Sequence, residues 1–98
     1  MNFSFLRKLR TSHGMSGAEL SRRAEVSQPT ISIIENNANQ PSVPTMDKIA
    51  GVFSLSSATM FAAATKKSEC SKQEYKRVVK PARKLIKNSI AQGAAANS

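Results

Sequence analysis

Apolar residues recur at helical spacing at the start of the chain. Phe3, Leu6 and Leu9 stand three residues apart, with basic residues between them. This spacing places the three side chains on one face of a helix and leaves the basic residues on the other. We therefore predict a helix over 3–12 that is ended by Gly14.

Two further short helices are predicted directly downstream. Ser16 and Glu19 form the pattern of a capping box, in which each side chain bonds a free backbone N–H at a helix start. Ser27 is a second N-cap residue, and Pro29 is tolerated because the first turn has no helical N–H bonds to lose. Residues 25–27 leave room only for a short turn between the two helices. The expected inner faces carry Leu20, Ala24, Ile31 and Ile34.

Asparagine and proline mark the end of the third helix. After glycine, asparagine best adopts the left-handed conformation of a helix end, so Asn36-Asn37 is expected to close this helix. Two prolines in the stretch 38–44 predict a loop. A fourth helix is predicted to begin at Pro44 or Thr45, and a short fifth helix to span about 56–61.

The last third of the chain follows a different pattern. Residues 62–70 are small, polar and charged without periodicity, which predicts a linker. A helix is predicted over 71–91, because apolar residues recur there with helical period opposite a row of lysines. Pro81 removes one backbone hydrogen bond, so this helix is expected either to kink or to divide. Residues 92–98 are expected to be disordered.

Positive charge is concentrated in residues 62–98, which we call the tail. The formal net charge of the whole chain is +9. Residues 1–61 hold six Lys/Arg and four acidic residues, whereas the tail holds nine Lys/Arg and two acidic residues. A polyanion is therefore the first partner to consider.

Several functional classes have no residues to support them. The single cysteine, Cys70, excludes an internal disulfide, and no metal or cofactor site is predicted. The one histidine, His13, is expected on the surface, and no nucleophile stands near a base, which argues against an enzyme. The N-terminus is polar again at Arg7 and no apolar run reaches membrane-spanning length. We therefore expect no membrane association and a cytoplasmic location.

The second and third predicted helices, with their short turn, indicate DNA binding. In such a pair the first helix lies across the DNA backbone while the second enters the major groove. On a helical wheel, the outward side of the third helix is short and uncharged, and we call it the reading face. Its predicted base contacts are Gln28, Pro29, Ser32 and Ile33. Gln28 can pair with adenine through two hydrogen bonds and is expected to be the main reader, whereas Ile33 can only contact a thymine methyl.

A longer run of residues extends this pattern in both directions. In chain order it comprises Leu6-Arg7-Lys8-Leu9-Arg10, Gly14-Met15-Ser16, Glu19-Leu20, Ala24, Val26-Ser27-Gln28, Thr30-Ile31-Ser32, Ile34-Glu35-Asn36, Pro41-Ser42, Ile49-Ala50 and Met60-Phe61. In order and spacing this run resembles the lambda-repressor/Cro-like (Xre-type) helix-turn-helix family over residues 3–61. The resemblance implies an all-α protein with a five-helix domain at 1–61 that binds double-stranded DNA. The tail lies outside the resemblance.

The resemblance also implies roles for residues beyond the reading face. The backbone N–H groups at Ser16 and Gly17, where the second helix starts, are expected to bind a DNA phosphate. Further phosphate contacts are implied for Asn36, Asn37, Asn39 and Gln40. Arg10 and Glu35 are implied to form a partly buried ion pair that ties the first helix to the end of the third.

Three positions depart from the family pattern. Gly17 stands where the family often has glutamine, so one helper of the main base contact is missing. Glu25 occupies a turn position usually held by glycine, which predicts mild strain or a slightly altered turn. Ile33 replaces a common polar or arginine residue and shifts that contact toward methyl recognition.

Plainer interpretations stay open for several of these residues. The helix pair could be purely structural, and the reading face could be an ordinary solvated surface. Ile33 could be a packing or dimer contact. Arg22 and Arg23 fit a solvated face better than a phosphate contact.

Three interpretations fit the tail. The first is a dimerisation helix, because twofold dimers read two half-sites at once. Its expected contacts are Tyr75, Val78, Val79, Leu85, Ile86 and Ile90. The second is a basic arm on flanking phosphates, which is compatible with the first. The third, a membrane-surface helix, leaves residues 1–61 without a role and is least favoured.

The sequence favours a transcriptional repressor of a phage, plasmid or bacterial operon. Such a protein binds a pseudo-palindromic operator as a homodimer. The alternative is an antitoxin, or a restriction-modification controller, that regulates its own operon. In that case the tail binds a protein partner such as a toxin or an anti-repressor.

Overall fold

Serine caps define where most helices of this protein begin. The computed structural model describes residues 1–96. Within them, the hydroxyl groups of five serines accept the backbone N–H three residues further on, at 3.0–3.3 Å. Each bond satisfies one free N–H of a helix start. The caps are Ser16, Ser27, Ser42, Ser56 and Ser71, and they open α2 (Gly17–Ala24), α3 (Gln28–Glu35), α4 (Val43–Val52), α5 (Ser57–Ala64) and α6 (Lys72–Glu74).

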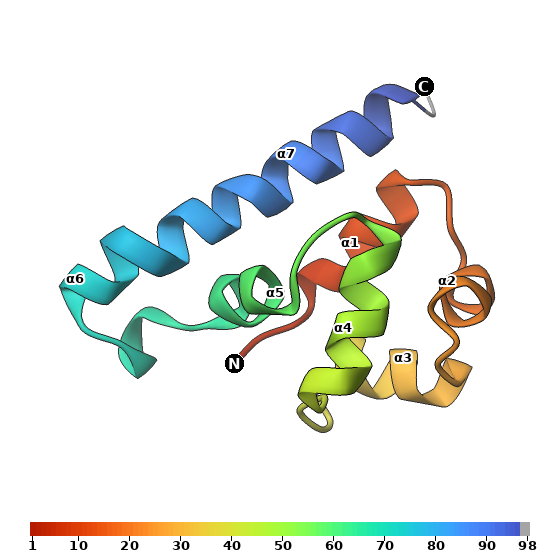
Figure 1. Ribbon diagram of the computed structural model, residues 1–98, viewed down its shortest axis with the longest axis horizontal. Coiled ribbons are helices and arrows are strands. Elements are labelled where there is room, and N and C mark those ends of the chain that lie inside the picture. The colour runs from red at the N-terminus through yellow and green to blue at the C-terminus, as the bar shows by residue number, and fades with distance from the viewer. Residues whose placement is uncertain (97–98) are drawn as a thin grey trace.

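The helix α1 (Phe5–Ser12) lies at the centre of this all-helical fold. It packs against α3 on one side and against the long C-terminal helix α7 (Lys80–Ala96) on the other (Figure 1). One core joins these helices, and its largest fully buried side chains are Phe3, Leu6, Leu9, Leu20, Ile31, Ile34, Met46, Ile49 and Met60. Burial stabilises the fold by about 1.5–3 kcal/mol for each such side chain. The apolar periodicity of residues 3–34 therefore identified the core correctly.

The helix α4 begins earlier than the sequence predicts. The predicted loop 38–44 ends at Ser42, because Ser42 caps the helix and Val43 is its first residue. Pro44 lies in the first turn, where proline costs no helical hydrogen bond. The prediction of a start at Pro44 or Thr45 is wrong because it treated this proline as a helix breaker.

The helix α5 is longer than predicted. It runs to Ala64, so the first residues of the predicted linker 62–70 are helical. A 3-10 turn, η1 (Lys67–Glu69), follows it. The amino group of Met1 donates to the Glu69 carboxylate at 2.8 Å, and this bond lowers the pKa of that carboxyl. The connection to the tail helices is therefore short and attached to the rest of the fold.

From α6 to the end of α7 the chain forms one continuous rod in Figure 1, not a divided helix. The helix α6 passes into a π-helical segment, η2 (Tyr75–Val79), and η2 passes directly into α7. In this segment the Lys80 N–H donates to the carbonyl of Tyr75, five residues earlier. The wider turn stands directly before Pro81 and accommodates the proline ring and its missing N–H.

The helix α7 continues to Ala96, so the prediction of disorder over 92–98 is wrong as far as residue 96. Residues 97 and 98 lie outside the part of the chain that the structure describes. Close contact holds this end in place, since a Cβ on Gly93 would lie 2.8 Å from the carbonyl oxygen of Ser12 in α1. Glycine therefore lets the two helices approach more closely than a larger residue would.

His13 also joins α1 to α7. Its Nε2 lies 3.0 Å from the carbonyl oxygen of Ser89, and its ring centre lies 5.3 Å from that of Phe53. The side chain is half-buried. The prediction of a surface position for His13 is wrong, because the sequence does not show that α7 returns to α1.

Most of the apolar side of α7 is covered by the chain's own domain. Val79 and Ile86 are buried, and Ile90 packs against the same core. The prediction that Val79 and Ile86 contact a second chain is wrong, because the chain's own domain covers them. Ile90 is half-buried, and its contact with a second chain stays a prediction. Val78 and Leu85 stay exposed, at 53% and 49%.

Arg83 fastens the start of α7 to the end of α5. Its Nε donates to the Ala63 carbonyl at 3.2 Å, and its Nη2 donates to the Thr65 carbonyl at 2.7 Å. These bonds satisfy carbonyl groups at a helix end, which have no partner within the helix. The Nη1 donates to the Tyr75 hydroxyl at 3.3 Å. Tyr75, predicted as a dimer contact, is thus used within the chain.

Candidate nucleic-acid interface

A three-residue turn joins α2 to α3. Ser21 holds this turn, because its carbonyl accepts the Val26 N–H at 3.1 Å and its hydroxyl donates to the Val26 carbonyl. Glu25 adopts the left-handed conformation, with a φ of 56°. This is the backbone that glycine adopts without a steric penalty, and the mild strain expected at Glu25 has its physical cause here.

Replacing Glu25 by glycine is expected to stabilise the protein by about 0.5 kcal/mol and to raise Tm by about 2–4 °C. The gain is the relief of the left-handed conformation, partly offset by the greater freedom of glycine in the unfolded chain. Thermal unfolding followed by circular dichroism measures it. Glu25→Ala is the matched control, since alanine removes the charge but keeps the strained Cβ. An equal gain from both variants would assign the effect to charge instead of backbone strain.

The predicted base contacts share the outer face of α3. The exposed residues of this reading face are Gln28, Pro29, Ser32 and Ile33. On the opposite side of the helix, Ile31 and Ile34 are 1% exposed and belong to the core. Figure 1 shows α3 along one edge of the molecule, with α7 along the opposite edge. The reading face is therefore open to solvent.

The start of α2 lies beside this face. The Ser16 hydroxyl accepts the N–H of Glu19 at 3.1 Å. The N–H groups of Gly17 and Ala18 precede the intrahelical bonds, and together with the helix dipole they favour an anion such as a DNA phosphate. A Cβ on Gly17 would lie 3.9 Å from Nε2 of Gln28. The expected phosphate contact and the expected base reader are therefore neighbours.

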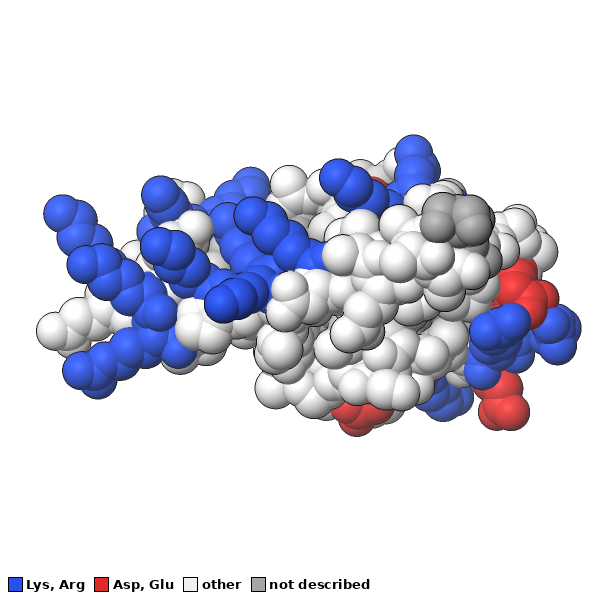
Figure 2. Space-filling model, turned by 90° about the horizontal axis from the view of Figure 1, so that it is seen from above, with Lys and Arg blue, Asp and Glu red and all other residues white. Residues whose placement is uncertain are grey.

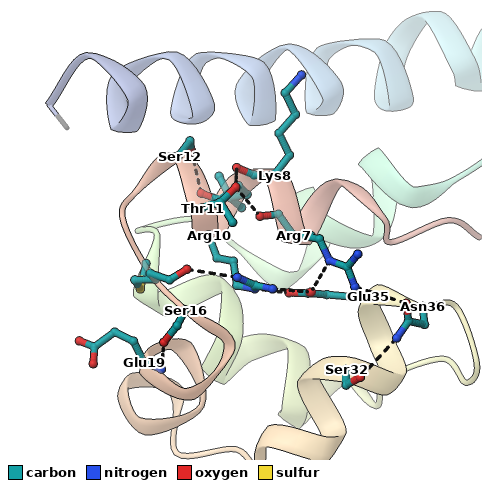
Figure 3. A network of polar contacts seen from close by, with 12 residues as sticks. Arg7, Lys8, Arg10, Thr11, Ser12, Ser16, Glu19, Ser32, Glu35 and Asn36 are labelled. Atoms are coloured by element: carbon teal, nitrogen blue, oxygen red, sulfur yellow. Dashed lines mark hydrogen bonds and ion pairs between the residues drawn. The ribbon is translucent and has the colours of Figure 1, made fainter. Parts of the chain in front are cut away.

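Glu35 is buried between two arginines below the reading face (Figure 3). Arg10 places its Nε 2.7 Å from Oε2 of Glu35 and its Nη2 3.1 Å from Oε1. Arg7 adds a bond from its Nε to Oε1 at 3.2 Å. The Glu35 side chain is 2% exposed and depends on these arginines to compensate its charge. The ion pair that the resemblance implies for Arg10 and Glu35 is thus present in the structure.

Arg7 is a site residue that the sequence reasoning missed. Its Nη2 donates to Oδ1 of Asn36 at 3.4 Å, and Nδ2 of Asn36 donates to the Ser32 hydroxyl at 3.3 Å. A chain of hydrogen bonds therefore runs from the ion pair to the reading face (Figure 3). The Arg7 side chain is 58% exposed, which leaves it accessible to a phosphate beside α3. The signal in the sequence is its position one helical turn before Arg10.

The loop after α3 contains one structural asparagine and several exposed residues. Asn37 has a φ of 56° and closes the helix as predicted. Its side chain accepts the Phe3 N–H at 2.7 Å and donates to the Asn2 side chain at 3.0 Å. Asn37 therefore holds the N-terminal segment; it is exposed, and the phosphate contact that the resemblance implies for it stays a prediction. Asn39 and Gln40 are exposed.

The outer side of α2 carries ion pairs between its own residues. The Glu19 carboxylate accepts hydrogen bonds from Arg22 at 2.6 Å and from Arg23 at 2.7 Å. These bonds lower the pKa of the Glu19 carboxyl, and the bond to Glu19 raises the pKa of the Arg22 guanidinium. Arg22 and Arg23 therefore fit a solvated face better than a phosphate contact.

More than half of the chain, residues 6–59, matches the helix-turn-helix family of the lambda-repressor (Xre) type. The chain belongs to this helix-turn-helix family. The family consists of DNA-binding transcription regulators. No curated protein and no solved structure matched the chain. The fold class and the class of DNA-binding regulator predicted from the sequence are confirmed.

In this helix-turn-helix, α2 and α3 form the motif and α3 is the recognition helix. Among the helices of residues 1–96, none is both long and apolar enough to span a bilayer. In the same part of the chain, no three His, Cys, Asp or Glu side chains group together as ligands for a metal ion.

Proposed function

We propose that this protein is a repressor that binds a pseudo-palindromic operator as a homodimer. The proposal is supported above all by the exposed, uncharged side of α3 beside the free N–H groups of α2. Side chains of this kind recognise base edges in the major groove, and helix starts bind the phosphates that fix the register.

Each part of the interface has a proposed role. Gln28 pairs with an adenine through two hydrogen bonds, and Ser32 donates to or accepts from a neighbouring base. Ile33 contacts a thymine methyl group, next to Pro29. Phosphate contacts are proposed for Arg7, Ser16, Gly17, Asn36, Asn39 and Gln40. Arg10 and Glu35 hold α1 against α3 and do not touch DNA.

Selection of one operator sequence in a genome requires a second copy of the chain. One recognition helix presents only about three or four side chains to base edges. These are too few to select one site among roughly 10⁶–10⁹ competing genomic sites. Two copies related by a twofold axis read two half-sites about 10 base pairs apart. Val78 and Leu85 are the residues of the predicted dimer surface that stay available.

Repression follows from such a dimer bound at a promoter, where it excludes polymerase. The proposed targets are phage, plasmid or bacterial operons, so the protein acts in the cytoplasm, where that DNA lies. The antitoxin alternative also includes operator binding, but it requires in addition a protein bound to the tail.

Binding to the DNA that flanks its own gene tests this function. We expect a discrete shift in gel electrophoresis, two chains per duplex by light scattering, and lower expression of a reporter placed behind that DNA. One chain per duplex would contradict the dimer, and a shift without reporter repression would contradict the repressor. A small protein that copurifies in equal amount would support the antitoxin alternative.

A further inference from the structure

The tail carries a basic surface that the helix-turn-helix does not use. Figure 2 shows Lys and Arg side chains gathered over the α6 end of the molecule and the first part of α7. We call this surface the basic face, and its exposed residues are Lys72, Lys76, Arg77, Lys80, Lys84 and Lys87. Glu74 is the one acidic residue in the sequence from 71 to 96. The surface therefore has a strong excess of positive charge.

The basic face lies on the other side of the domain from the recognition helix. The helix α1 lies between α3 and α7 (Figures 1 and 3). The apolar side of α7 is turned toward α1 and α5, and Figure 2 views the molecule from the α7 side. A duplex seated on α3 therefore lies on the other side of α1 from the lysines of α7.

The helix α7 is docked and is not a free arm. Arg83 fixes its first part through the carbonyl groups of Ala63 and Thr65. The carbonyl oxygen of Ser89 lies 3.0 Å from Nε2 of His13, and Gly93 lies against α1. Bringing the lysines round to the duplex on α3 would break all of these contacts. An arm on the same duplex, one of the interpretations of the tail, is therefore disfavoured.

The arrangement of the lysines suits a phosphate backbone. Lys76, Lys80, Lys84 and Lys87 line one shallow hollow next to Tyr75. Lys80, Lys84 and Lys87 are four and three residues apart, so they share one side of α7 over about 10 Å. A lysine ammonium is a flexible point charge, and a row of them follows a repeating anion without fixed geometry. DNA is the repeating anion that this protein already binds.

We propose that the basic face binds the phosphate backbone of a second DNA duplex, without sequence preference. One molecule then joins two duplexes, one on α3 and one on the basic face. The proposal rests on the proposed function, because the first duplex is the operator bound by α3. A repressor built in this way keeps a second DNA segment close to its operator and raises the local concentration of DNA there.

Bridging between two duplexes tests the proposal. A duplex with the sequence that the protein enriches from a randomised library, here called the selected duplex, is fixed to beads. A labelled duplex of arbitrary sequence is then added with the protein. The wild type is expected to retain the label, and the Lys76→Gln/Lys80→Gln/Lys84→Gln variant is expected to lose it. Both should bind the selected duplex equally. For the arbitrary duplex, the slope of log affinity against log salt should become shallower by about 2.7 in the variant.

The matched control is Lys→Arg at the same three positions, which keeps the charge and should keep bridging. Bridging that persists in the glutamine variant would overturn the proposal, and so would loss of bridging in the arginine variant. Failure of the proposed function gives a different result. In that case Gln28→Ala/Ser32→Ala leaves binding to the bead-bound duplex unchanged, while the glutamine variant loses binding to both duplexes.

Discussion

Replacement of Glu35 by alanine is expected to destabilise the protein by about 3 kcal/mol or more, because it leaves a partly buried arginine without its partner. Glu35 accepts three hydrogen bonds from Arg7 and Arg10, at 2.7–3.2 Å. The Arg10 side chain is only 15% exposed, so water compensates its charge only in part when the carboxylate is removed. In a domain of this size, a loss of about 3 kcal/mol lowers Tm by roughly 12 °C or more. Thermal unfolding by circular dichroism measures the change.

Two further variants separate the buried pair from a general loss of charge. Glu19→Ala removes a carboxylate that also binds two arginines but is 27% exposed, and water screening keeps its expected effect on Tm small. Arg10→Met/Glu35→Leu removes both buried charges and is expected to recover much of the lost stability. If Glu35→Ala lowers Tm no more than Glu19→Ala, the ion pair is not what holds α1 to α3.

Replacement of Gln28 by alanine is expected to weaken operator binding by about 1–3 kcal/mol, or roughly five- to 150-fold. This is the discrimination that a bidentate contact with adenine contributes. Affinity for DNA of arbitrary sequence should stay nearly unchanged, because the phosphate contacts proposed for Gly17 and Arg7 remain. Fluorescence anisotropy with both duplexes at one salt concentration measures the two affinities.

Gln73→Ala is the matched control for this measurement. Gln73 is an exposed glutamine on α6, at the other end of the molecule from α3 (Figure 1). It should change neither affinity. An equal loss of both affinities in Gln28→Ala would assign Gln28 to backbone contact, and no loss at all would remove it from the interface.

The first three helices could be predicted from the sequence because their signals are local. Apolar residues at helical spacing marked the inner faces, and a serine marked the start of α2 and of α3. For α4 the local signals conflict, because Pro44 indicates a helix break whereas Ser42 caps a helix that has this proline in its first turn.

The helix of the tail could be predicted, but its packing could not, because that packing depends on contacts distant in sequence. An apolar side predicts that a helix packs against another element, but it does not identify that element. In the structure the cover is α1 and α5, and Arg83 and Gly93 fix the contact through carbonyl bonds and close approach. The sequence around Arg83 and around Gly93 does not indicate either contact. The apolar spacing therefore predicts dimer contacts for Val79 and Ile86, although both are buried within one chain.

The candidate site also contains residues that local sequence predicts and residues whose roles depend on the fold. The reading face follows from helical periodicity and needs no knowledge of the fold. The role of Arg7 depends on how α1 crosses α3, and that of Asn37 on where the N-terminal segment lies. Family resemblance supplied the pair of Arg10 and Glu35 but not the third member.

Site selection from a randomised duplex library tests the central claim most directly, namely that the outer face of α3 reads the DNA sequence. The wild type and Gln28→Ala/Ser32→Ala are compared at the same salt concentration. We predict that the wild type enriches one motif with twofold symmetry, and that the variant still binds DNA but loses the base preference at the positions these two side chains contact. Enrichment of the same motif, equally strongly, by both proteins would contradict the account.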